Sequence, residues 1–100
     1  MIERTWRGTA NIDNANRYIE HLKTDTFPKV RNIPGNMGAK VLSRTLDSHV
    51  EFLVVTTWAS MDAIKAFAGG DVAVAVVPEE AQAALLKYDT TVKHYELVDA

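Results

Sequence analysis

The stretch VVTTWASMDAIKAFAG, residues 54–69, changes from strand to helix within a few residues. Its β-branched run ends at Trp58, and Ser60 follows as a residue type that commonly caps helices. A helical apolar pattern then runs to the glycine pair at 69–70. Two interpretations of Trp58 are open at this point. The side chain either plugs the core, or it also forms a wall of a pocket between a sheet and a helix.

The strand that ends at Trp58 is one half of a predicted hairpin. Residues 37–46 and 49–58 have strand character, and Asp47-Ser48 between them suits a tight turn. The second of these strands is apolar on both faces, which is typical of a strand that is covered on both sides. Helices can cover one face, so we expect another protein surface on the other.

The remaining segments complete an alternation of strands and helices. Residues 71–77, DVAVAVV, are compatible with a strand or a helical turn, and we favour the turn because the segment is short and precedes Pro78. The other predicted elements are a strand at 2–9, a helix at 12–24 that Phe27-Pro28 interrupts, a helix at 79–87 and a strand at 90–98.

This order, β-α-β-β-α(α)-β, predicts an α+β fold of the ferredoxin-like split βαβ type. A four-stranded antiparallel sheet would carry helices on one face and leave the other bare. That bare face would hold too much apolar surface to remain in contact with water. We therefore expect residues 1–100 to form a single domain and to pair, sheet to sheet, as a homodimer.

Composition excludes several classes of partner and chemistry. The 100 residues carry a formal net charge of −2, so nothing in the charge favours nucleic acid or an anionic membrane. The chain has no cysteine, which excludes disulfides, thiolate metal ligands and cysteine nucleophiles. No apolar run approaches the ~20 residues that span a bilayer, and the N-terminus has no apolar signal core. We expect a cytoplasmic protein.

Four phrases of the chain resemble the antibiotic biosynthesis monooxygenase family, whose members form dimeric α+β barrels. They are IERTWRG, IPGNMGAKVLSR, TTWASMDAIKAFAG and TVKHYELV, and the likeness covers nearly the whole chain. The resemblance implies a homodimer with one pocket per subunit, between sheet and helices. Characterised relatives have at least two activities, which are oxidation of phenolic compounds to quinones by O2 without metal or flavin, and degradation of haem; many relatives have no established function.

The residues that haem-degrading relatives use are missing here. Those proteins have an asparagine on the first strand, and a tryptophan and a histidine on the helical segment after the hairpin. Phe67 and Val77 stand at the corresponding helical positions, and no asparagine precedes Asn11. We therefore favour an oxygenase that uses no cofactor, acting on a small aromatic or quinol-type compound. A dimeric protein that binds a small hydrophobic ligand without catalysis is the alternative.

An oxygenase of this kind needs a fixed donor for the substrate anion and aromatic walls that exclude water. Arg4 shares a strand face with Trp6, and an arginine is rare on a central strand unless its charge is paired. We predict that Arg4 stabilises the anion; the alternative is an ion pair with Glu51 or Glu96. The predicted pocket residues are Trp6, Tyr18, Met37, Trp58 and Phe67.

The histidines are candidates for the proton-transfer group. His94 on the last strand and His21 on the first helix are both candidate bases, because the pKa of an imidazole lies near neutrality. Each has a structural alternative, as a hydrogen-bonded histidine of the surface or interface. The three histidines sit on separate elements without metal-ligand spacing, so we expect neither a metal site nor a cofactor.

Overall fold

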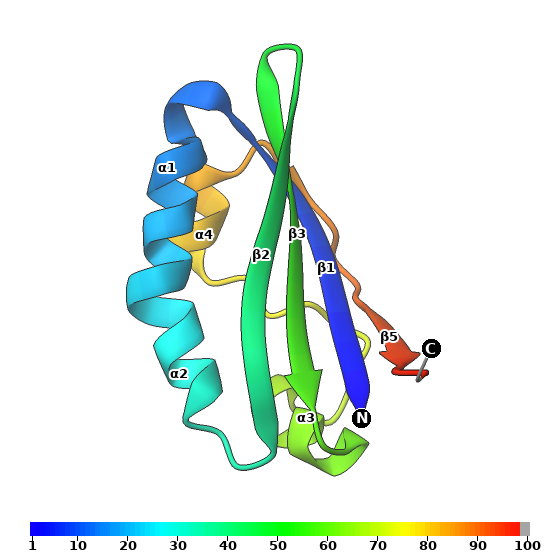
Figure 1. The fold of residues 1–100 in the computed structure, drawn as a ribbon. Coiled ribbons are helices and arrows are strands. Elements are labelled where there is room, and N and C mark those ends of the chain that lie inside the picture. The colour runs from blue at the N-terminus through cyan, green and yellow to red at the C-terminus, as the bar shows by residue number, and fades with distance from the viewer. Residues whose placement is uncertain (99–100) are drawn as a thin grey trace.

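The computed structural model describes residues 1–98, in which helices cover one face of an antiparallel sheet (Figure 1). The strands are β1 (Ile2–Asn11), β2 (Asn36–Leu46), β3 (His49–Trp58), β4 (Lys87–Tyr88) and β5 (Lys93–Glu96). The helical segments are α1 (Ile12–His21), the π-helical turn η1 (Leu22–Thr26), α2 (Phe27–Arg31), α3 (Met61–Ala68) and α4 (Glu79–Ala84).

Strand β1 lies in the centre of the sheet. The strand order is β2-β3-β1-β4, and β5 also pairs with β1. The β1–β3 pairing sets Arg4 opposite Thr56, while on the other side of β1 the same residue lies opposite His94. Since directly paired residues point to the same face, these three side chains lie on one face of the sheet. The α+β ferredoxin-like fold expected from the sequence is confirmed.

The hairpin and the helix after Trp58 form as the sequence predicts. Leu46 pairs with His49 across the turn, and Asp47 takes the left-handed conformation with φ of 49°. At the start of α3, the Ser60 hydroxyl accepts a hydrogen bond from the Ala63 amide at 3.2 Å. Ser60 is thus the predicted N-cap, which satisfies one of the free amides of the first turn.

The first helix differs from its prediction. Phe27-Pro28 does not interrupt it, because helical backbone continues from residue 12 to residue 31. The irregularity comes earlier, as the π-helical turn η1, in which the Phe27 amide bonds to the Leu22 carbonyl. Phe27 alone separates this wider turn from Pro28. Proline has no amide hydrogen, and in a regular α-helix its ring clashes with the carbonyl four residues earlier, so a wider turn accommodates it.

The helical turn favoured for 71–77 is wrong. This segment forms a single β-bridge, between Val74 and Thr91, and no helix. The bridge is supported by hydrogen bonds from the Ala75 amide to the Thr90 carbonyl and from the Val92 amide to the Ala73 carbonyl, both 2.9 Å. Val74 is therefore the one residue of this segment in a β-bridge, while Val72 lies in a turn and residues 75–77 have no regular structure.

The C-terminal elements are shorter than expected. Helix α4 ends at Ala84, the two-residue strand β4 follows, and β5 begins only at Lys93. The segment between the two strands leaves the sheet around the bridge at Thr91. Among the described residues, none of the helices is both long enough and apolar enough to cross a membrane.

Two packed clusters form the core between the sheet and the helices. One is centred on Phe52 and Tyr18, whose rings lie 5.0 Å apart. The other contains Trp58, Ile64 and Val30, all of them buried. The cavity described next lies between these clusters, because residues of both contribute to its wall.

Candidate functional site

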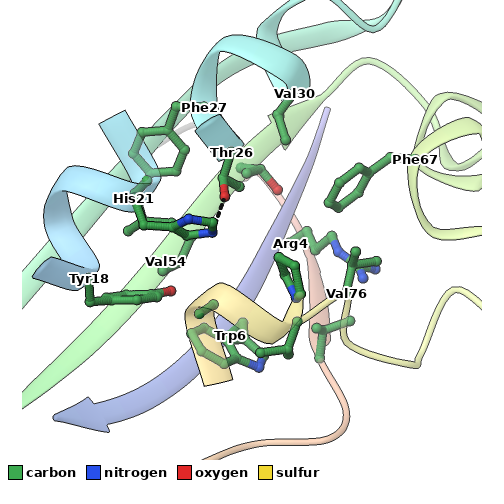
Figure 2. A pocket seen from close by; sticks show the side chains of 16 residues that line it. Arg4, Trp6, Tyr18, His21, Thr26, Phe27, Val30, Val54, Phe67 and Val76 are labelled. Atoms are coloured by element: carbon green, nitrogen blue, oxygen red, sulfur yellow. Dashed lines mark hydrogen bonds between the residues drawn. The ribbon is translucent and has the colours of Figure 1, made fainter. Parts of the chain in front are cut away.

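A cavity of about 60 Å³ lies between the sheet, the helical run α1–η1–α2 and the segment before α4 (Figure 2). Most of its wall is aromatic or aliphatic, which keeps bulk water away from a bound molecule. The aromatic residues of the wall are Trp6, Tyr18, Phe27 and Phe67, and the polar ones are Arg4, His21, Thr26 and Thr56. The cavity is thus apolar with a few polar groups, the composition usual for a small-molecule site, and its volume is well below the roughly 300–1,000 Å³ of such sites, so a ring compound would have to displace parts of the wall.

Arg4 brings a positive charge into this wall although its side chain is almost completely buried, with 4% of its surface exposed. Its guanidinium donates hydrogen bonds to the carbonyls of Val72, at 2.6 Å, and Val74, at 3.1 Å. Burial lowers the pKa of Arg4 from its usual value, although a guanidinium remains protonated at neutral pH. Arg4 therefore supports the 72–74 segment and also presents a cation at the cavity.

No carboxylate of the described residues 1–98 forms an ion pair with Arg4. Glu51 instead accepts a hydrogen bond from Arg44 at 3.0 Å, and Glu96 lies 3.9 Å from the N-terminal amine. The two ion pairs considered from the sequence are therefore absent. A buried cation without an anionic partner is unfavourable, and an anionic ligand would remove that cost.

His94 lies beside Arg4 but not in the wall of the cavity. Its Nε2 is 3.0 Å from an Arg4 guanidinium nitrogen. Because a guanidinium can only donate hydrogen bonds, Nε2 must be the unprotonated acceptor, and the ring is neutral. Burial, and secondly the charge of Arg4, lower the pKa of His94 below 6.5. His94 is placed to orient Arg4 and not to touch a ligand.

Tyr18 and His21 project from α1 into the wall of the cavity. The Tyr18 side chain is 2% exposed, and burial raises its pKa well above the usual value, so the hydroxyl stays protonated. Figure 2 shows this hydroxyl pointing toward the centre of the cavity. His21 Nε2 lies 3.2 Å from the Thr26 hydroxyl, at the spacing of five residues that a π-helical turn brings together. Both side chains can exchange hydrogen bonds with a ligand.

Phe67 lines the cavity beside Arg4, and Trp58 packs behind Phe67. The Arg4 guanidinium lies 5.6 Å from the centre of the Phe67 ring, within the range of a cation–π contact. Phe67 in turn stacks on Trp58, with ring centres 5.7 Å apart. Trp58 is fully buried and donates a hydrogen bond to the Thr56 hydroxyl at 2.8 Å. Trp58 is therefore a core residue that supports two wall residues from behind.

The structure brings together five of the eight residues predicted for the site: Arg4, Trp6, Tyr18, His21 and Phe67. Trp58 and His94 lie one layer outside the wall, and Met37 is 57% exposed at the start of β2. The sequence analysis missed Phe27, Thr26 and Thr56. The position of Thr56 opposite Arg4 follows from pairing the two strands, which was a usable signal.

The comparisons with known proteins agree with this architecture. Residues 5–79 match the family model described as antibiotic biosynthesis monooxygenase. A crystal structure of a putative antibiotic biosynthesis monooxygenase from Bacillus cereus is similar, with 18% identity, a TM-score of 0.68, and coverage of 99% of this chain and 96% of that chain. No curated protein matches the sequence.

Other similar folds carry different descriptions. A heme-degrading protein from Mycobacterium tuberculosis, with two hemes bound in its active site, is 18% identical with a TM-score of 0.59, covering 100% of this chain and 98% of that chain. A protein of unknown function from Nitrosomonas europaea is also 18% identical, with a TM-score of 0.64 and coverage of 99% and 90%. These likenesses concern the fold.

Proposed function

The chain belongs to the antibiotic biosynthesis monooxygenase family, and we propose that it oxidises a small aromatic or quinol-type compound with O2, using neither metal nor flavin. The observation that carries this proposal is the buried cation of Arg4 in an aromatic cavity, with no carboxylate of the described residues paired to it. Such a site favours a flat ring that becomes an anion, because the anion gains the interaction that Arg4 lacks.

The proposed reaction begins with loss of a proton from the bound ring compound. The resulting anion transfers one electron to O2, and the substrate radical and superoxide then combine to form a C–O bond. The O–O bond breaks with loss of the second hydrogen from the same carbon. For a substrate whose ring carries a CH2 group, such as an anthrone, the balance converts CH2 and O2 into C=O and water, so one oxygen atom enters the product and the other leaves in water. A quinol instead loses two hydrogens to O2 and gives a quinone and H2O2.

Each protein group has one role in this proposal. Arg4 stabilises the anion, and a preorganised charge in a dry site is worth far more than the same charge in water. His21 accepts the proton, because it lines the cavity whereas His94 does not. Tyr18 donates a hydrogen bond to an oxygen of the ring compound. His94 is a positioning residue in this arrangement.

We also propose that two chains pair through the sheet face opposite the helices. Leu42 and Tyr95 are 51% and 54% exposed, and Leu53 lies between them on the same face. A second copy would cover this surface, which a lone domain leaves in water. Light scattering at micromolar concentration tests the pairing, and a monomer mass would contradict it.

Oxygen uptake by metal-stripped protein tests the activity. Anthrones, naphthoquinols and catechols would be supplied one at a time, with the product analysed by mass spectrometry. We expect uptake that depends on the protein and persists with chelator present. With an anthrone, one oxygen atom from 18O2 should enter the product. If ligands bind and are recovered unchanged in air, the protein is a binding module and the oxygenase proposal is wrong.

A further inference from the structure

His21 is in contact with two carboxylates as well as with Thr26. Asp25, in the turn η1, places Oδ2 3.9 Å from His21 Nε2, and Glu80, in the first turn of α4, places Oε2 3.6 Å from Nδ1. One ligand atom from each of the three side chains lies within 4.8 Å of the others. The histidine ring thus stands between acidic groups from two different helical segments.

Asp25 and Thr26 both approach His21 from the following helical turn. Thr26, five residues on, contacts Nε2 because of the π-helical hydrogen bonding, and Asp25 lies at the four-residue spacing that any helical turn brings together. The fold supplies Glu80, because α4 packs against α1 although 59 residues separate the two side chains along the chain. Neither contact follows from the spacing of histidines in the sequence.

From this cluster we propose a binding site for a divalent first-row transition-metal ion, with Zn²⁺ as the expected occupant, held by His21, Asp25 and Glu80. One imidazole nitrogen and two carboxylate oxygens are a ligand set that such ions accept, with a water at the fourth position. Ligand atoms around a tetrahedral Zn²⁺ are roughly 3.3–3.6 Å apart, given metal–ligand bonds near 2.1 Å.

Closing the cluster around an ion requires only small movements. The His21 side chain is 10% exposed and held by Thr26, whereas the Glu80 side chain is 78% exposed and free to rotate toward it. The remaining nitrogen of a ligating histidine normally contacts a second polar group, and here the Thr26 hydroxyl, 3.2 Å from Nε2, is that group and leaves Nδ1 for the ion.

Lys29 competes with the ion for one ligand. Its Nζ lies 2.7 Å from Asp25 Oδ1, and this hydrogen bond is the main reason why the pKa of Asp25 is lowered. An aspartate carboxylate is charged at neutral pH, as a metal ligand must be. Since a metal ion and the lysine ammonium repel each other across that carboxylate, removing the lysine charge should strengthen metal binding.

Calorimetric titration of the untagged, metal-free protein with Zn²⁺ tests this site, together with the visible absorption of bound Co²⁺. We expect one ion per chain. Glu80→Gln and Asp25→Asn should each weaken binding by at least about tenfold, the lower range seen when metal sites lose even an outer partner. Glu79→Gln is the matched control, because it removes a neighbouring charge of α4 and leaves the cluster intact.

Lys29→Met gives the sharpest readout, because the proposal expects this variant to bind Zn²⁺ more tightly than the natural chain. A structural ion pair between Lys29 and Asp25 would not lead to that result. The proposal is overturned if millimolar Zn²⁺ gives no binding. It is also overturned if Glu80→Gln and Asp25→Asn bind as tightly as the natural chain.

Metal occupancy would also affect the proposed reaction, and this consequence alone rests on the proposed function. A metal-bound imidazole nitrogen cannot accept a proton, so Zn²⁺ should inhibit oxidation if His21 is the base. The titrations need no substrate. A failed oxygen assay would therefore leave the metal site unaffected, and failed titrations would leave the oxygenase proposal standing.

Discussion

Arg4→Met is expected to reduce kcat/KM for the oxidisable ring compound by at least about a hundredfold, the loss typical of removing one preorganised donor to a developing anion. The methionine fills much of the same space but carries no charge. Its effect should fall on anion stabilisation, because Phe67, Tyr18 and Trp6 remain to hold the ring. Steady-state oxygen uptake measures the loss.

The stability of Arg4→Met should change much less than its activity. The variant loses the hydrogen bonds to the Val72 and Val74 carbonyls, but it also removes a buried cation that has no carboxylate partner in the described chain. These two terms oppose each other. The clearest structural change should be faster hydrogen exchange in the 72–78 segment, which Arg4 ties to the sheet.

Arg17→Met is the matched control for charge, because Arg17 is an exposed residue of α1. It should leave oxygen uptake unchanged. Arg4→Lys separates charge from geometry, since lysine keeps the charge but cannot reproduce the two-pronged contact with the 72–74 carbonyls. If Arg4→Met oxidises substrate at the natural rate, Arg4 has no part in the reaction.

The pKa of His94 also depends on the contact between His94 and Arg4. In the natural chain it lies below 6.5, so between that lowered value and 6.5 the unfolded chain binds more protons than the folded one. Stability should therefore fall as the pH is lowered through this window. In Arg4→Met the charge that helps to lower the pKa is gone, and an NMR titration should find the His94 pKa closer to 6.5.

The fold could be predicted largely because its strongest signals are local. β3 has the predicted bounds, and Ser60 caps α3 as expected, since both depend on residues close in sequence. The first helix misled the prediction because Pro28 indicates a break but not how the chain accommodates it. A π-helical turn has no sequence signature of its own, so Phe27 was expected to interrupt the helix and was not expected in the cavity wall.

The site could be predicted only in part, because its composition depends on which sheet face the helices cover and on how the helices pack. The alternation of β1 places Arg4 and Arg7 on opposite faces, but no pattern in the sequence says which face the helices cover. In the structure, Arg4 lies on the sheet face that the helices cover, and Arg7 is exposed. Likewise, a search for histidine spacing could not find Glu80 beside His21, because a carboxylate of α4 reaches that ring only through helix packing. Asp25 is four residues from His21, and that helical spacing was a usable signal.

Trp58→Ala is expected to lower the free energy of unfolding by about 3–5 kcal/mol, the usual cost of truncating a buried tryptophan. Trp58 is fully buried with Ile64 and Val30, so the neighbours cannot relax far enough to fill the space. Domains of this kind are stable by about 5–15 kcal/mol, and the loss should be large on that scale. Urea unfolding measures it, and Ile12→Ala at a half-exposed position of α1 is the control that should change little.

Trp58→Phe distinguishes the volume of the side chain from its hydrogen bond. Phenylalanine fills most of the space but leaves the Thr56 hydroxyl, in the cavity wall, without the indole donor. We expect it to cost about 1–3 kcal/mol, clearly less than alanine. Phe67 stacks on Trp58 and faces Arg4. In Trp58→Ala the Phe67 ring should therefore become mobile and ligand binding should weaken, whereas in Trp58→Phe the Phe67 ring should stay in place. Equal stability losses in the two variants would mean that packing against Trp58 does not support this wall, and the layered arrangement behind Arg4 would be wrong.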